Sequence, residues 1–438
     1  MKRLLCLFAI LVSAVFAAAQ TGSASGAAFS LEQVNAIYPE VQALYVDLHR
    51  NPELAFQEKQ SAAKLAERMR KLGYDVTTGV GKTGVVAVLK NGPGPTVMLR
   101  TDMDALPVLE KTGLPFASTV TVKNDAGATI PVMHACGHDT HMAAWIGTAK
   151  LMAQNRQRWH GTLVMIGQPA EEIVQGAAAM LKDGLYTRFP KPDFALALHD
   201  SGQLATGQIG FHPGYYMSAS DSVYITIFGR GGHGAKPQMT VDPIVIAART
   251  ILALQTIVSR ENDPLEMAVI TVGSIHGGTK NNIIPDEVKL ELTVRSFNPE
   301  VRKHLWAAIE RVTKAEALAA AAPREPLVKV EPGTNAVYND PELTKRVAAT
   351  LRRTLGPQNV VEMPPNTASE DFSEYGAAGV PAVMLHFGAA NAAKLAASQQ
   401  TGTPLPQTHS PLWAPEPESL KTAIMAETAM LLDLMGGK

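Results

Sequence analysis

The chain has 438 residues, more than a single hydrophobic core usually supports, so we expect two domains. Its formal net charge is −1 at pH 7, and 46 % of its residues are hydrophobic. This near-neutral composition argues against a nucleic acid or an anionic membrane as partner and is typical of a globular protein.

The N-terminal segment, residues 1–19, is similar to a secretory signal peptide. Lys2 and Arg3 precede a nearly continuous apolar run over residues 4–16, and three alanines precede Gln20. The run is too short to span a bilayer as a mature helix. We therefore predict cleavage near Gln20 and a periplasmic or secreted protein that is free of the membrane; a retained short anchor is the alternative.

Cysteine usage adds a constraint on the exported protein. The chain has two cysteines, Cys6 and Cys136, and cleavage removes Cys6. The remaining thiol cannot form an internal disulfide. In an oxidising compartment we expect Cys136 to be buried or bound to a metal.

Apolar runs and turn signals predict the elements of a first domain, residues 29–214. Apart from Thr162, the two runs over 162–166 and 194–198 are apolar, which is typical of central strands covered on both faces. The expected elements are helices over 61–72, 140–152 and 176–181 and strands over 85–89, 97–99, 162–166 and 194–198. This βαβ succession predicts an α/β catalytic domain with a mostly parallel sheet covered by helices.

The pattern changes after residue 214. Strands are expected over 223–228, 268–272 and 288–294, and helices over 242–259 and 301–318. This β-α-β-β-α order predicts a small inserted α+β unit of ferredoxin-like type. We place the insert at 215–326, with an exit linker over 319–326, and expect residues 327–438 to complete the catalytic domain.

Side chains that bind metals gather where the predicted strands end. Residues 133–141 read Met-His-Ala-Cys-Gly-His-Asp-Thr-His, and Glu171 and Glu172 follow the next apolar run. His199 closes another run, and His409 comes much later. In open α/β sheets, sites form at the carboxyl ends of the strands. The sequence therefore predicts a metal-dependent hydrolase site at one edge of the sheet.

Longer motifs in a specific order strengthen this interpretation. They are HRNPEL at 49–54, RTDMDALP at 100–107, HACGHD at 134–139, PAEE at 169–172, GRGGH at 229–233, NIIPD at 282–286, SEDF at 369–372 and THSP at 408–411. With them the chain resembles the metallo-aminoacylase and carboxypeptidase family, in the branch of hippurate hydrolases and indoleacetyl-amino acid hydrolases. The resemblance implies a two-metal catalytic domain interrupted by a lid domain that pairs two subunits.

The resemblance also implies roles for single residues. The implied metal ligands are Cys136, His138, Glu172, His199 and His409. Glu171 is implied as the general base. The residue types agree, because a thiolate can bridge two cations and each imidazole supplies one nitrogen. Two divalent ions per subunit, Zn²⁺ or Mn²⁺, would be the cofactors.

The insert carries a second group of polar residues. In the family, the residues that match His233, Asn282 and Arg295 meet the substrate's carbonyl or carboxylate, and the histidine reaches across from the partner subunit. The chemistry agrees, because a developing oxyanion needs donors and arginine suits a carboxylate. Two departures concern the substrate pocket: Gln238 replaces a frequent histidine, and Asp200-Ser201 replaces an apolar or aromatic pair.

Some ligand assignments have alternatives. His386 also ends an apolar run and competes with His409 as the last ligand. Cys136 could be an inert buried thiol or half of a Cys-His nucleophilic pair with His138. His199 could be a core histidine, and His233 could stand in a solvent-exposed turn.

Four polar neighbours are expected around the ligands. His134 and His141 are expected to support ligands or to lie in a helix. Asp102 and Asp104 could orient a ligand imidazole or cap a turn. His49 is expected to have a structural role.

The sequence thus predicts a metal-dependent amidohydrolase that cleaves N-acyl amino acids or amino acid conjugates. A dipeptidase or exo-carboxypeptidase acting on short peptides is the alternative within enzymes. A catalytically silent binding protein is the alternative of another class, although no ligand type or base is missing from the motifs. We expect a homodimer joined through the lid domain.

Overall fold

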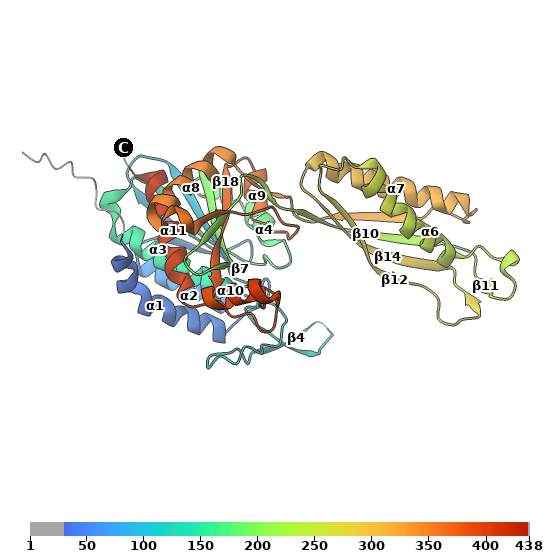
Figure 1. The fold of residues 1–438 in the computed structure, drawn as a ribbon, viewed down its shortest axis with the longest axis horizontal. Coiled ribbons are helices and arrows are strands. Elements are labelled where there is room, and N and C mark those ends of the chain that lie inside the picture. Colours follow the sequence, from blue (N-terminus) through green and yellow to red (C-terminus); the bar gives the residue numbers. More distant parts are fainter. Residues whose placement is uncertain (1–29, 125, 437–438) are drawn as a thin grey trace, which may run out of the picture.

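The computed structural model of the protein describes residues 30–124 and 126–436. They form two units, a larger one built on an eight-stranded sheet and a smaller, elongated one built on a four-stranded sheet (Figure 1). The expected signal peptide at residues 1–19 lies outside the described residues.

The large sheet is mixed, with a parallel centre. Its strand order is β1 (Asp75–Val80), β2 (Gly84–Asn91), β6 (Gly161–Gln168), β3 (Thr96–Asp102), β7 (Phe194–Ala205), β18 (Ala382–Ala390), β8 (Ile209–Phe211) and β17 (Val360–Glu362). The strands β6, β3, β7 and β18 are parallel, and β8 and β17 are parallel to each other. The pairs β1–β2, β2–β6 and β18–β8 are antiparallel.

Helices cover both faces of this sheet. One face carries α1 (Leu31–Arg50), α2 (Lys59–Lys71), α3 (His138–Gln154), α8 (Pro341–Leu355) and α11 (Ser419–Met435), and the other carries α4 (Gly176–Lys182), α5 (Leu185–Arg188) and α9 (Ser373–Ala377). Successive side chains of a strand point to opposite faces, so Val97 and Leu99 enter the first core while Met98 enters the second. The α/β architecture predicted from the apolar strands is confirmed.

The small unit is a sheet with two helices on one face. Its strand order is β12 (Ala268–His276), β14 (Glu287–Ser296), β10 (Ala219–Phe228) and β15 (Leu327–Pro332), and all neighbours are antiparallel. The helices α6 (Pro243–Thr256) and α7 (Pro299–Ala319) share one core with the sheet. The chain order β-α-β-β-α-β with this strand order is the predicted ferredoxin-like unit.

The return to the large unit comes later than the sequence indicated. We expected the insert to end at 326, because residues 319–326 are rich in alanine and proline. Strand β15 instead pairs with β10 along Asp221–Thr226 and closes the small sheet. The boundary expected at 326 is therefore wrong, since the fourth strand has to pair before the chain leaves the unit.

Several short elements connect these layers. They are the pairs β4 (Thr121–Lys123) with β5 (Thr129–Pro131), β9 (Gly214–Met217) with β16 (Val337–Asn339) and β11 (Gly232–His233) with β13 (Ile283–Ile284), the helix α10 (Ala392–Thr401), a π-turn at Ile257–Glu261 and 3-10 turns at Arg156–Arg158, Pro237–Met239 and Pro357–Asn359. The pair β9–β16 lies where the chain crosses between the two units.

A candidate dinuclear metal centre and active site

The turn that carries Cys136 is positioned by a glycine. Gly137 has φ 74°, in the left-handed region, and caps α3, which begins at His138. A Cβ at Gly137 would lie 2.1 Å from Oδ2 of Asp200. Only glycine therefore allows this turn to pass so close to Asp200 of β7, and the turn brings the Cys136 thiol and the His138 imidazole to the same site.

Three of the predicted ligands converge at this edge. One ligand atom from each of Cys136, His138 and Glu172 lies within 4.8 Å of the others. His138 donates from Nδ1 to the backbone oxygen of Asp104 at 2.8 Å, which leaves its Nε2 as an acceptor. That Nε2 and Oε1 of Glu172 are buried without a hydrogen-bond partner in the described structure. Buried acceptors that face one another without a donor fit a cation between them.

The other two predicted ligands complete the group. His199 places Nε2 3.5 Å from the sulfur of Cys136, while its Nδ1 lies 2.8 Å from the backbone oxygen of Asp200. His409 places Nε2 3.3 Å from Oε2 of Glu172 and has a positive φ of 70°. Its backbone N–H donates to the oxygen of Ala135 at 2.6 Å, which joins His409 to the segment that carries Cys136.

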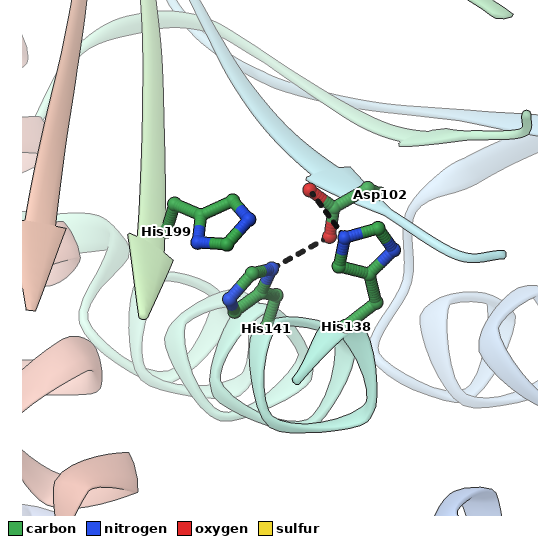
Figure 2. Close-up of side chains that lie close together, drawn as sticks. All are labelled: Asp102, His138, His141 and His199. Carbon is green, nitrogen blue, oxygen red and sulfur yellow. Dashed lines mark hydrogen bonds and ion pairs between the residues drawn. The ribbon is translucent and has the colours of Figure 1, made fainter. Parts of the chain in front are cut away.

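Asp102 and His141 form a layer behind the ligands. Figure 2 shows Asp102 joined by dashed lines to His141 and His138, with His199 beside them. Asp102 accepts from Nδ1 of His141 at 2.7 Å, and Nε2 of His141 accepts from the backbone N–H of Asp200 at 2.9 Å. Because both nitrogens of His141 are engaged, it supports the site and is not placed to bind a metal.

Asp104 organises both halves of the site. Its backbone oxygen accepts from His138, and its carboxylate accepts from the backbone N–H groups of Glu171 and Glu172, each at 3.0 Å. The side chain is buried. Asp104 thus orients the imidazole of His138 and holds the turn of the Glu-Glu pair, the two roles that the sequence left open.

Glu171 stands beside the ligands in a buried position. Its carboxylate lies 3.9 Å from Nε2 of His138. Burial, and then the negative charges of Glu370 and Glu172, raise the pKa of Glu171 well above its usual value. A carboxylate with a raised pKa takes up a proton readily, which suits a general base.

Glu171 lies next to a buried network of ion pairs around Arg100, which was not predicted from the sequence. The Arg100 guanidinium contacts Asp102 at 2.6 Å, Glu370 at 2.7 Å and Asp371 at 3.4 Å, and Nε bonds to Gln168. Carboxylate oxygens of Glu171, Glu370 and Asp371 lie within 4.8 Å of one another. The signal in the sequence is an arginine that directly follows the apolar run over residues 97–99, because a charge on a buried strand requires buried partners.

The remaining histidines have other surroundings. His386 is hydrogen bonded through Nδ1 to the hydroxyl of Tyr216, and its ring centroid lies 5.8 Å from that of His199. His134 is buried, with neither nitrogen partnered. His49, at the end of α1, bridges Asp139 at 2.6 Å and Glu110 at 3.1 Å, a structural position as expected.

The ligand group opens into a cavity of about 740 Å³ that both units line. Glu171, Glu172, His199 and His409 border it from the large unit. Arg295, on β14, borders it from the small unit and is the only arginine or lysine among its described lining residues. The carboxylate of a bound ligand would therefore form its ion pair with Arg295.

His233 and Asn282 lie elsewhere. Both are exposed and belong to the β11–β13 pair and its flanking turn, and Gly234 donates to the oxygen of Asn282. This pair is at the far end of the small unit from the large one (Figure 1). The structure does not bring these two residues to the ligand group of the same chain.

Comparisons with known proteins agree with this geometry. The N-acetyl-L-cysteine deacetylase of Bacillus subtilis is 38 % identical over 329 residues, 75 % of this chain and 75 % of that protein. The hippurate hydrolase of Campylobacter jejuni is 37 % identical over 337 residues, 76 % of this chain and 84 % of that protein.

A solved structure and a family profile point the same way. A Bacillus subtilis protein described as a dinuclear metal-binding peptidase of the M20 family superposes with a TM-score of 0.74 at 31 % identity, over 90 % of this chain and 98 % of that one. Residues 98–403 match the profile of peptidase family M20/M25/M40. With this match and the identity to its relatives, the chain belongs to the peptidase family M20/M25/M40.

Proposed function

We propose that the protein is a metal-dependent amidohydrolase that hydrolyses the amide bond of N-acyl amino acids. The observation that carries this proposal is the convergence of five metal-binding side chains and Glu171 on a cavity whose only arginine or lysine, among the described residues, is Arg295. Relatives named hippurate hydrolase and N-acetyl-L-cysteine deacetylase support the same substrate class.

The donor set fits two divalent ions. Cys136, His138, Glu172, His199 and His409 would hold them. When bound, the ions polarise the carbonyl and make water a stronger acid. Sulfur favours zinc over manganese, so Zn²⁺ is the first candidate and Mn²⁺ the second.

The protein's own groups then handle the proton and the substrate. Glu171 takes a proton from the attacking water as the bond from water oxygen to carbonyl carbon forms. It returns that proton to the amide nitrogen as the carbon–nitrogen bond breaks, which releases the free acid and the amino acid. Arg295 pairs with the carboxylate of the amino acid and so aligns the amide with Glu171.

A homodimer would complete this site. The small unit exposes apolar side chains on α6, with Ile244, Val245 and Leu252 at 42 %, 56 % and 72 % exposure. The helix that includes α6 is mostly apolar: among the described residues, Pro243–Glu261 is the only helix that is apolar and long enough to cross a membrane. β12 is an edge strand, which can pair with another chain. We take the partner to be a second copy, whose His233 would donate to the developing oxyanion.

There are three alternative functions for this site: two are enzymatic, and the third is binding without catalysis. A dipeptidase or exo-carboxypeptidase would use the same residues with a peptide substrate. A silent binding protein would not need the base, yet Glu171 lies beside a complete set of ligand side chains. That observation favours catalysis.

The same proposal includes export. The sequence of residues 1–19 supports a cleaved signal peptide and a periplasmic or secreted enzyme. Intact-mass analysis of the exported protein tests this: a chain that begins near Gln20 supports it, and a chain that retains residues 1–19 overturns it.

The deciding experiment is a substrate panel. Purified protein is stripped with a chelator, refilled with single divalent metals and assayed on N-acyl amino acids and dipeptides, with Glu171→Gln as the matched control. Hydrolysis of N-acyl amino acids that depends on metal and on Glu171 supports the proposal. Turnover of dipeptides alone assigns the peptidase alternative, and no turnover with any metal favours the silent one.

A further inference from the structure

One more imidazole borders the pocket without belonging to the ligand group. His386 lies on β18, directly opposite His199 of β7 in the register of the sheet, and the two ring centroids are 5.8 Å apart. It lines the same cavity as Glu171 and Arg295. No step of the proposed reaction uses His386.

Tyr216 determines which nitrogen of His386 carries the proton. The buried Tyr216 hydroxyl is hydrogen bonded to Nδ1 of His386. Its other neighbour is Sδ of Met363 at 3.6 Å, and a thioether is a weak acceptor compared with an unprotonated imidazole nitrogen. The hydroxyl therefore donates to Nδ1, and the ring proton stays on Nε2.

The Nε2–H group is free to meet a ligand. Nδ1 is occupied by Tyr216, and within residues 30–124 and 126–436 no side chain or backbone group is hydrogen bonded to Nε2 of His386. Nor is this atom among the buried polar atoms that lack a partner, so it is open to the cavity. A neutral N–H donor that faces the cavity can donate a hydrogen bond to an acceptor on the substrate.

The segment 363–369 separates His386 from Arg295. Met363 contacts the hydroxyl that bonds His386, whereas Ser369, at the other end, is hydrogen bonded to the Arg295 guanidinium. Pro364 and Pro365 restrict the backbone between them, and the segment contains no helix. Both donors border the same cavity, and this segment contacts Tyr216 at one end and Arg295 at the other. A substrate whose carboxylate binds Arg295, and whose acyl group fills the rest of the cavity, would bring that group to His386.

We propose that His386 is a specificity residue that donates from Nε2 to an uncharged oxygen of the acyl group. The preferred substrates would then be N-acyl amino acids whose acyl part carries an ether, hydroxyl or keto oxygen besides the scissile carbonyl. This inference rests on the proposed function, since it names a subsite of that pocket. An uncharged oxygen fits because the neutral His386 ring offers one N–H donor and no positive charge to balance an acyl carboxylate.

The test compares substrates that differ in one atom. Ortho-, meta- and para-methoxybenzoyl conjugates of the best amino acid are paired with the ethylbenzoyl conjugates, which replace the ether oxygen by CH2. For each pair the ratio of kcat/KM measures the preference for oxygen. We expect wild type to prefer the methoxy member in at least one pair, and His386→Phe to lower that ratio about tenfold, the value of one unmade hydrogen bond.

Three further variants separate donation from packing. His386→Gln places an amide N–H near the position of Nε2 and should keep part of the preference. Tyr216→Phe releases Nδ1 and should lower the ratio, because the ring can then present a lone pair to the pocket. Tyr186→Phe is the control, since its hydroxyl donates to the backbone oxygen of Tyr375 and, within residues 30–124 and 126–436, Tyr186 does not border the cavity.

The outcomes distinguish the inference from the proposed function. An unchanged ratio in a folded His386→Phe enzyme, or no preference for oxygen in wild type, overturns the inference. An equal loss of kcat on both members of each pair also overturns it, because His386 would then act on the reacting atoms. Failure of wild type to hydrolyse any N-acyl amino acid refutes the proposed function itself.

Discussion

Asp104→Asn is the sharpest test of how the site is assembled. The Asp104 carboxylate accepts from the backbone N–H groups of Glu171 and Glu172 at 3.0 Å each, in a fully buried position. Asparagine keeps one acceptor oxygen but turns its N–H2 towards the second backbone N–H. One hydrogen bond is lost, and two donors face each other.

The size of the effect follows from that count. A hydrogen bond to a charged group contributes about 1.5–3 kcal/mol, so the turn that carries the Glu-Glu pair should lose about 2 kcal/mol. That corresponds to about 30-fold weaker binding of the ion held by Glu172. The value lies within the range of about 10- to 100-fold for hydrogen-bond partners of metal ligands.

The assay is a metal titration against a competing chelator, with kcat measured at saturating metal. Asp340→Asn is the matched control, because Asp340 also accepts a backbone N–H, from Leu343, but does not border the metal pocket. Wild-type metal affinity and turnover in a folded Asp104→Asn protein would refute the reasoning, since the turn would then not depend on this carboxylate.

Four more predictions follow from the site. Glu171→Gln should lower turnover by about 10²–10⁴-fold and leave the metal content, measured by elemental analysis, near wild type; lost metal would make Glu171 a ligand. Cys136→Ser should weaken metal binding, and the wild-type thiol should react with an alkylating reagent only after chelation, whereas equal labelling in both states argues against a ligand role. Mixing His233→Ala chains with Glu171→Gln chains should restore up to about half of the activity of a wild-type dimer, once subunit exchange is proven. The reason is that one site of each mixed dimer combines an intact Glu171 with an intact His233. No recovery means that His233 does not act across the dimer. Burial lowers the pKa of His49, but hydrogen bonds and charges from Asp139 and Glu110 outweigh it and raise the pKa to about 10. This folded-state pKa lies above the unfolded value of about 6.5. The ion pairs of protonated His49 therefore stabilise the fold fully below about pH 6.5, and this contribution is lost as the pH rises through about 10. The difference in melting temperature between wild type and His49→Gln should shrink over that window, and a constant difference would contradict the charged state of His49.

Several features could be predicted from local sequence. The apolar runs at 162–166 and 194–198 correspond to β6 and β7, because strands buried on both faces need apolar residues throughout. The helix expected over 140–152 is α3, His138–Gln154. The ligand types were also readable, since few residue types bind metals and they follow the strand ends.

Other features depend on partners far away in the chain. Arg100 was not singled out, because Glu370 and Asp371, which balance its charge, are 270 and 271 residues away. The end of the insert was misplaced because β15 is recognisable as part of the small unit only through its pairing with β10. No local pattern contains either contact.

What the sequence by itself determined was the chemistry: a thiol, imidazoles and carboxylates at strand ends, an α/β sheet and a ferredoxin-like insert. These follow from residue type and from hydrophobic periodicity, which are local properties. The tertiary structure alone decided which acceptors remain unpartnered for a cation, that His141 is occupied on both nitrogens, and that Tyr216 leaves Nε2 of His386 free. Hydrogen-bond partners are set by proximity in space, and the chain brings those groups together only when the sheet and its helices pack.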